Sequence, residues 1–230
     1  QNTDVLQLHD KVLLKYRESG IKPEKATVKR GMDIIVALLM LVIASPFMLI
    51  IMICIKAEDG GPILYKQDRV TIGGKAFQML KFRSMRVDAE KEGARLAAKN
   101  DSRITKIGKI IRNIHFDELP QLINILKGDM SVVGPRPERM EFIEEYSRII
   151  PEFKERLKVR GGLTGYAQIY SKYNTGPEEK AKYDLMYIYN YSLRLDIKLV
   201  FLTLRILFQK ENTEGVDEEQ KSAVKAQTKL

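Results

Sequence analysis

Two adjacent carboxylates, Asp117 and Glu118, lie in the part of the chain that is densest in reactive residue types. An ionised carboxylate can attack a phosphorus atom and form a covalent bond to it, and a second carboxylate can bind Mg²⁺. A helix is predicted to begin near Asp117, and the free N–H groups at a helix start stabilise negative charge, so Asp117 is expected to stay ionised. The alternative is that Asp117 only caps this helix, which is a common role for aspartate.

Basic side chains suited to phosphate occur in three other segments. Prolines on both sides of Arg136, in the Pro-Arg-Pro segment 135–137, fix the backbone and can present the guanidinium in one direction for a bidentate contact. Lys81 and Arg83 would share one face of a predicted strand. Arg69 is a further candidate for substrate binding. The alternatives are that the Pro-Arg-Pro segment is only a stiff turn with Arg136 in solvent, and that Lys81 and Arg83 lie on a solvated strand face.

The composition limits the kinds of chemistry that the chain can perform. Lys and Arg outnumber Asp and Glu by 39 to 30 in 230 residues, and the formal charge of +9 suits phosphate-bearing partners, although it also promotes solubility. The chain has one cysteine, Cys54, and two histidines, His9 and His115. These exclude an intrachain disulfide and a Cys/His zinc site, so any metal would be a hard ion held by carboxylates and phosphate.

An apolar run over residues 34–55 is long enough to cross a bilayer core, which needs about 20 apolar residues. Ser45 and Pro46 interrupt it near the middle, and proline kinks or breaks a helix. Lysines and arginines flank both ends, and cationic flanks favour the cytoplasmic side. A helix that enters, breaks and returns satisfies both flanks, with the Ser45 hydroxyl available for a freed backbone group. The alternative is a plain span with a tolerated proline.

The remaining pattern predicts the elements that must position these residues. Residues 1–20 suggest an amphipathic helix or a linker, and Gly73-Gly74 predicts a hairpin turn between strands at 63–70 and 75–82. An apolar stretch at 195–208 suits either the membrane interface or the core. We further predict helices at 87–99, 102–114 (with Asp101 or Ser102 as its cap), 117–128, 137–150 and 151–159. Residues 161–165 are predicted to form a glycine-rich loop, and the tail from 209 onward is predicted to be disordered.

Several of these segments together resemble the bacterial sugar transferase family, the monotopic phosphoglycosyl transferases. The matching segments are KRGMDIIVALLMLVIASPFMLI (29–50), KFRSMR (81–86), DELPQLINILKGDMSVVGPRP (117–137), GLTGYAQI (162–169) and NYSLRLDIKL (190–199). The resemblance covers residues 27–210. It departs from the family pattern at His115-Phe116, where smaller or hydroxyl residues are usual, at Gly161, where proline is frequent, and at Tyr166, where tryptophan is frequent.

The resemblance implies Mg²⁺-dependent transfer of a sugar phosphate from a UDP-sugar to polyprenyl (undecaprenyl) phosphate, with release of UMP. It implies that Asp117 attacks the β-phosphorus and forms an aspartyl-phosphosugar, and that Glu118, with Asp117, holds the metal. Arg136 would contact the nucleotide or its phosphates, and Lys81 and Arg83 match a basic motif near the site. The implied location is the bacterial inner membrane, with a re-entrant helix broken at Ser45-Pro46 and the catalytic domain on the cytoplasmic face.

The resulting expectation is an α/β fold that is mostly helical with a small hairpin or sheet. We divide the chain into an N-terminal segment or linker (1–28), a re-entrant helix (29–56), a cytosolic transferase domain (57–210) and a polar tail (211–230). The first residue is Gln, which predicts a fragment of a longer protein or a processed product. Homo-oligomers are compatible with the pattern, and nucleic acid is not an expected partner. The rival hypothesis is a non-enzymatic, membrane-anchored basic module that binds nucleic acid or anionic lipid.

Overall fold

The computed structural model describes residues 2–8, 11–17, 21, 23–89, 101–171 and 175–207. This part of the chain is mostly helical and contains three two-stranded sheets, which confirms the expected balance of elements. The helices are α1 (Pro23–Asp59), α2 (Lys106–Asn113), α3 (Gln121–Lys127), α4 (Met140–Ile149), α5 (Tyr166–Tyr170), α6 (Pro177–Tyr189) and α7 (Leu193–Leu207). Three 3₁₀ segments are η1 (Ile72–Gly74), η2 (Phe116–Glu118) and η3 (Pro151–Lys158). The strands are β1 (Asn2–Leu8), β2 (Lys11–Arg17), β3 (Leu64–Val70), β4 (Ala76–Phe82), β5 (Met130–Val133) and β6 (Gly161–Thr164).

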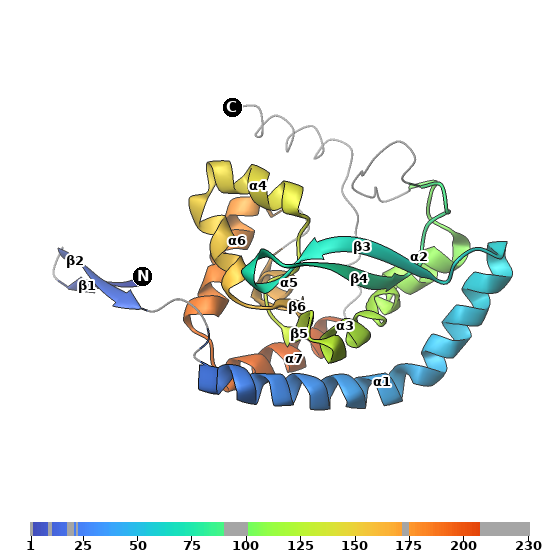
Figure 1. Ribbon diagram of the computed structural model, residues 1–230, viewed down its shortest axis with the longest axis horizontal. Coiled ribbons are helices and arrows are strands. Elements are labelled where there is room, and N and C mark those ends of the chain that lie inside the picture. Colours follow the sequence, from blue (N-terminus) through green and yellow to red (C-terminus); the bar gives the residue numbers. More distant parts are fainter. Residues whose placement is uncertain are drawn as a thin grey trace.

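The break expected at Ser45-Pro46 is absent, because helix α1 is continuous through Pro46 and only bends in its second half (Figure 1). Proline has no N–H, so the carbonyl four residues earlier, that of Val42, loses its helical donor. The Ser45 hydroxyl donates to this carbonyl over 2.8 Å, as the sequence predicted. The helix is long and apolar enough to cross a membrane, and only 17% of its most apolar window is buried. A core helix of a soluble protein would be mostly buried, so α1 indicates membrane association.

The predicted hairpin is confirmed. Strands β3 and β4 pair antiparallel, and Leu64 faces Phe82 at their open end. Gly73 and Gly74 connect them with φ values of 69° and 76°, which L side chains rarely adopt. Helix α3 contacts both the hairpin and α1, and it lies between them in Figure 1. The hairpin is therefore fixed to the membrane helix through α3.

Other expectations of local structure were wrong. The described residues 2–8 and 11–17 are not helical, because they form the antiparallel strands β1 and β2, so the helix alternative for this segment was wrong. The cap of α2 is Thr105, whose side chain accepts the Gly108 N–H, while Asp101 accepts the Arg103 N–H. The predicted helix at 117–128 begins only at Gln121, after the separate turn η2, although it ends at Gly128 as expected.

The C-terminal half of the domain also differs in part from the prediction. The glycine-rich segment 161–165 contains strand β6, which pairs parallel with β5, so it is not a simple loop. The segment 137–150 becomes helical only at Met140, and Pro151 begins a 3₁₀ segment, not an α-helix. The predicted helix at 87–99 and the tail from 209 lie almost entirely outside the described residues.

Helix α7 has two apolar faces with different surroundings. Leu199 is fully buried in the main core, which also contains Leu122 and Met130. Ile197 and Phe201 are 49% and 68% exposed on the same helix. The core alternative for this stretch is therefore confirmed for one face of the helix, and its placement at the membrane interface stays a prediction for the other face, which is apolar and exposed.

A buried ionic cluster joins the start of α1 to α7 and β5. The Lys29 ammonium lies 2.7 Å from the Asp196 carboxylate and 3.8 Å from that of Asp33. Asp33 also accepts the Ser131 hydroxyl and the Val132 N–H. Burial raises the pKa of Asp196, and the charge of Lys29 opposes this shift. One lysine thus compensates two buried carboxylates at the junction of the membrane helix with the domain.

Replacing this lysine tests how strongly the junction depends on it. Lys29→Met should destabilise the fold by about 3–5 kcal/mol, because it leaves two buried carboxylates without their cation. Thermal unfolding in detergent measures the loss. Lys25→Met, at an exposed position one turn earlier, is the matched control and should change the midpoint little. Equal midpoints for Lys29→Met and the wild type would contradict this role.

Candidate active site

Three of the predicted site residues converge on one carboxylate. Glu118 in η2 lies 2.9 Å from the Lys81 ammonium on β4 and forms an ion pair with the Arg136 guanidinium. A second hydrogen bond joins Arg136 Nη1 to Glu118 Oε2 over 3.3 Å. Burial would raise the pKa of Glu118, but Arg136 and Lys81 together hold it well below its usual range. Glu118 therefore stays ionised between two cations.

Asp117 is buried beside this ionic cluster. Its exposed fraction is 9%, and burial raises the pKa of its carboxyl group, against the opposing charge of Lys81. The helix start expected at Asp117 is absent, because Asp117 lies in a three-residue 3₁₀ turn before α3, and its burial acts against the ionised form. A carboxylate that has lost its water shell is more reactive toward an electrophile. The position of Asp117 thus suits a nucleophile that faces cations.

The turn that carries both carboxylates begins with an unusual backbone conformation. His115 has φ of 57° and ψ of 20°, in the left-handed region, and it is the only described residue other than glycine with positive φ. Histidine tolerates this region better than most residues, yet the conformation still stores strain. It redirects the chain after α2, so that the two acids turn toward β4.

Asn124 on α3 was not predicted, although it positions Lys81. Its side chain is 1% exposed, accepts the Leu80 N–H over 2.9 Å and donates to the Gln78 carbonyl over 2.9 Å. These bonds satisfy backbone groups of β4 that no third strand in the described part of the chain pairs with. They hold the strand at Leu80, immediately before Lys81. The signal in the sequence was a lone polar residue among the apolar residues of 122–126.

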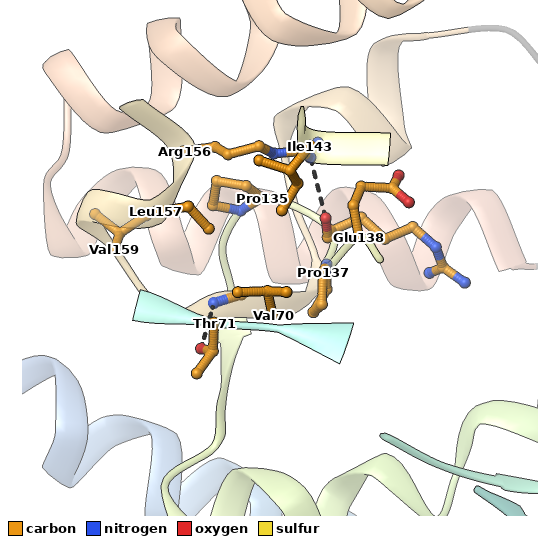
Figure 2. Close-up of a pocket in the computed structure, with 11 residues that line it drawn as sticks. Val70, Thr71, Pro135, Pro137, Glu138, Ile143, Arg156, Leu157 and Val159 are labelled. Carbon is orange, nitrogen blue, oxygen red and sulfur yellow. Dashed lines mark hydrogen bonds between the residues drawn. The ribbon is translucent and has the colours of Figure 1, made fainter. Parts of the chain in front are cut away.

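Arg136 lies in the turn that follows β5, and hydrogen bonds with β6 hold this turn in place. The Gly134 N–H donates to the Thr164 carbonyl, and the Gly162 N–H donates to the Pro135 carbonyl, both over 2.8 Å. A Cβ on Gly162 would lie 2.1 Å from the Gly134 nitrogen, so this approach requires glycine. Figure 2 shows the small pocket behind the turn, into which Arg156 and Ile143 project.

The other two predicted basic residues have different contacts. Arg83 is buried and pairs with Asp59 at the end of α1, so it connects β4 to the membrane helix. Arg69 on β3 donates to the Pro137 carbonyl over 3.1 Å and pairs with Glu138 over 2.9 Å. Neither residue pairs with Glu118. The structure therefore brings Lys81 and Arg136 to Glu118 and gives Arg83 and Arg69 other partners.

The donor atoms at Asp117 and Glu118 fit magnesium. Among the described residues, no group of three or more His, Cys, Asp and Glu gathers as a metal site, so the protein would supply at most this pair. Magnesium commonly takes one or two carboxylates and completes its shell with water and substrate phosphates. Asp117 and Glu118 could supply such carboxylates, and both oxygens of Glu118 accept hydrogen bonds from Arg136 in this structure. When bound, Mg²⁺ would supply neutralisation of phosphate charge there.

Comparison with known proteins adds independent information. Residues 24–210 match the family described as bacterial sugar transferase. The chain is 43% identical over 188 residues to a UDP-N-acetylgalactosamine-undecaprenyl-phosphate N-acetylgalactosaminephosphotransferase of Aeromonas hydrophila, covering 80% of this chain and 44% of the relative. It is 42% identical over 181 residues to a UDP-glucose:undecaprenyl-phosphate glucose-1-phosphate transferase of Klebsiella pneumoniae, covering 76% and 39%.

The match to a third relative covers most of that protein's length. The putative undecaprenyl-phosphate N-acetylgalactosaminyl 1-phosphate transferase of Bacillus subtilis (strain 168) is 53% identical over 130 residues, which are 56% of this chain and 73% of that protein. By contrast, the chain spans less than half the length of the Aeromonas and Klebsiella relatives. The family match covers most of the chain and every residue of the site described above. This chain belongs to the bacterial sugar transferase family.

Proposed function

We propose that this protein transfers a sugar 1-phosphate from a UDP-sugar to undecaprenyl phosphate and thereby starts the assembly of a glycan such as an exopolysaccharide, a capsule or an O-antigen. The observation that carries the proposal is the buried Asp117 carboxylate next to Glu118, which pairs with the two cations Lys81 and Arg136. The relatives are named for this type of reaction, with glucose or N-acetylgalactosamine as the sugar. Their names differ in the sugar, so the donor of this protein is to be found by screening.

In the first step, an oxygen of Asp117 attacks the β-phosphorus of the UDP-sugar. A phosphorus–oxygen bond to Asp117 forms as the bond to the UMP oxygen breaks, and UMP leaves with the electron pair. Lys81 and Arg136 would bind the diphosphate and stabilise the charge that develops on its oxygens. Arg69 and Arg83 remain predicted substrate-binding residues. They would act from the edge of this site, since their contacts lie with Glu138 and Asp59.

In the second step, a phosphate oxygen of the lipid attacks the same phosphorus and displaces Asp117. The product is a polyprenyl-diphosphate sugar, and the Asp117 carboxylate is regenerated. A covalent intermediate allows the water-soluble donor and the lipid acceptor to use one small site in turn. The rival hypothesis of a non-enzymatic basic module loses support from the family match, and nucleic acid is not a proposed partner.

The contacts of α1 support a re-entrant arrangement. Near its start, Lys29 pairs with Asp196 of α7, and at its last residue Asp59 pairs with Arg83, which follows β4. Both ends are thus bound to the same domain, whereas a spanning helix places its ends on opposite sides of the membrane. The bend and the exposed apolar side chains between the ends suit insertion into one leaflet. We place the domain on the cytoplasmic face of the bacterial inner membrane, because the flanks of the helix are cationic.

Asp117→Asn should abolish UMP release, because an amide cannot form the phosphosugar bond. The assay uses UDP-glucose and UDP-N-acetylgalactosamine with undecaprenyl phosphate and Mg²⁺, and it measures UMP. Asp88→Asn, a change of the same kind at an exposed position, is the control and should retain full activity. The wild type incubated with donor alone should yield a peptide containing Asp117 that carries the mass of a sugar phosphate. Full activity in Asp117→Asn would refute the nucleophile assignment.

The re-entrant arrangement predicts that both ends of α1 react from the cytoplasmic side. Single cysteines are introduced as Lys25→Cys and Ala57→Cys in a Cys54→Ser background, at two exposed positions. A membrane-impermeant maleimide should label both only in inside-out vesicles. Ala57 is preferred to Gly60, whose φ of 68° disfavours a side chain. Labelling of the two cysteines from opposite faces would establish a span instead.

Removal of divalent cations should stop the reaction before the covalent step. With EDTA, the wild type should release UMP at least 100-fold more slowly, since metal neutralisation of phosphate charge contributes several kcal/mol to such reactions. Added Mg²⁺ should restore the rate, and Zn²⁺ should restore it poorly, because the site offers only carboxylates. Undiminished release in EDTA would exclude a role for the metal.

A further inference from the structure

All three backbone carbonyls of the Pro-Arg-Pro turn are hydrogen-bonded. The Pro135 carbonyl accepts the Gly162 N–H over 2.8 Å. The Arg136 carbonyl accepts Nη2 of Arg156 over 3.0 Å, and the Pro137 carbonyl accepts Nη1 of Arg69 over 3.1 Å. The prolines fix φ on both sides of Arg136, but they leave the orientation of its own peptide to these contacts. The Arg156 contact is therefore the one that fixes the peptide of Arg136 itself.

Arg156 is itself held firmly. Its side chain is 8% exposed, and the same Nη2 lies 2.8 Å from the carboxylate of Asp184, which is 2% exposed. The guanidinium also stacks 4.5 Å from the ring centre of Phe153. An arginine with these three partners has little freedom to rotate, so its bond to the Arg136 carbonyl defines the position of the turn. Figure 2 shows Arg156 extending across the pocket toward the turn.

Stability alone gives a weak reason for this buried pair. Burial raises the pKa of Asp184 to about 6 despite the charge of Arg156, and the second oxygen of Asp184 has no hydrogen-bond partner among the described residues. A buried ion pair that is only partly satisfied is often less stable than apolar residues of similar volume. An arrangement with this cost is understandable where it fixes the direction of a functional side chain.

We propose that Arg156 is a positioning residue: it holds the backbone of Arg136 so that the Arg136 guanidinium faces Glu118 and the diphosphate of the donor. This inference rests on the proposed function for the identity of the ligand. Arg156 itself touches no substrate in this account, since its described partners are Asp184, the Arg136 carbonyl and the Phe153 ring. The competing explanation is that the Arg156–Asp184 pair serves only to stabilise the fold.

A double substitution separates the two explanations. Arg156→Met with Asp184→Leu replaces the pair by apolar side chains, so the midpoint of thermal unfolding should stay the same or rise. If Arg156 positions Arg136, the Kd for UDP, measured by calorimetry, should still rise about tenfold, because small misplacements of binding groups weaken binding steeply. Arg160→Met is the matched control: the Arg160 side chain also donates to a backbone carbonyl, but to that of Gly128 and not to one of the Pro-Arg-Pro turn. Its Kd should change less than twofold.

A cycle with Arg136→Lys completes the test. In the wild-type background Arg136→Lys should weaken UDP binding about tenfold through loss of the bidentate contact. In the Arg156→Met/Asp184→Leu background the same change should weaken it less than threefold, because the contact is already impaired. A stable double variant with wild-type affinity for UDP, or effects that multiply fully, would overturn the positioning role.

The same readouts keep this inference apart from the proposed function. The Kd for UDP does not depend on turnover, so it reports on positioning even if no UDP-sugar yields UMP. Wild-type protein that binds UDP but releases no UMP would refute the proposed reaction and leave the positioning role to be decided by the cycle. Wild-type protein that does not bind UDP would refute both.

Discussion

The site depends on one constraint, which is that the buried carboxylate of Glu118 must be compensated. Lys81 and Arg136 supply the two cations, from positions 37 residues before and 18 residues after it. Each cation in turn needs a support. Asn124 holds the edge of β4 next to Lys81, and β6 holds the turn that carries Arg136. Without substrate, the Glu118 carboxylate pairs with both cations. The diphosphate of a donor would compete with Glu118 for these contacts.

A second constraint acts on α1, whose polar and apolar residues have opposite surroundings. Lys29 and Asp33 near its start are buried in the domain, whereas Val42 and Ile43 in its middle are 71% and 62% exposed. This is the reverse of a helix on the surface of a soluble protein, in which apolar side chains turn inward. The arrangement is stable only if lipid covers the apolar face. The helix therefore indicates membrane association, and its buried polar start joins it to the domain.

Local signals in the sequence predicted some parts of this structure well. The Gly-Gly turn, the stop of α3 at Gly128 and the use of Ser45 to bond the carbonyl freed by Pro46 follow from backbone chemistry within a few residues. The pairing of β5 with β6 and the role of Asn124 depend on contacts between distant segments, which no local pattern encodes. For the same reason, the strand pattern of Lys81 and Arg83 predicted a shared face but not the separate partners, Glu118 and Asp59.

The two acids illustrate how surroundings give neighbouring residues different roles. Adjacent carboxylates repel each other, so one of them benefits from strong compensation and the other is left more easily protonated. Arg136 and Lys81 hold the pKa of Glu118 far below its usual range, whereas burial raises the pKa of Asp117. Pairs whose pKa values are driven apart in this way commonly divide a reaction between them. The carboxylate with the weaker ionic compensation is Asp117, so in the proposed reaction it would be the nucleophile, because fewer contacts must break before it attacks. Glu118, held ionised by Arg136 and Lys81, would organise the cations.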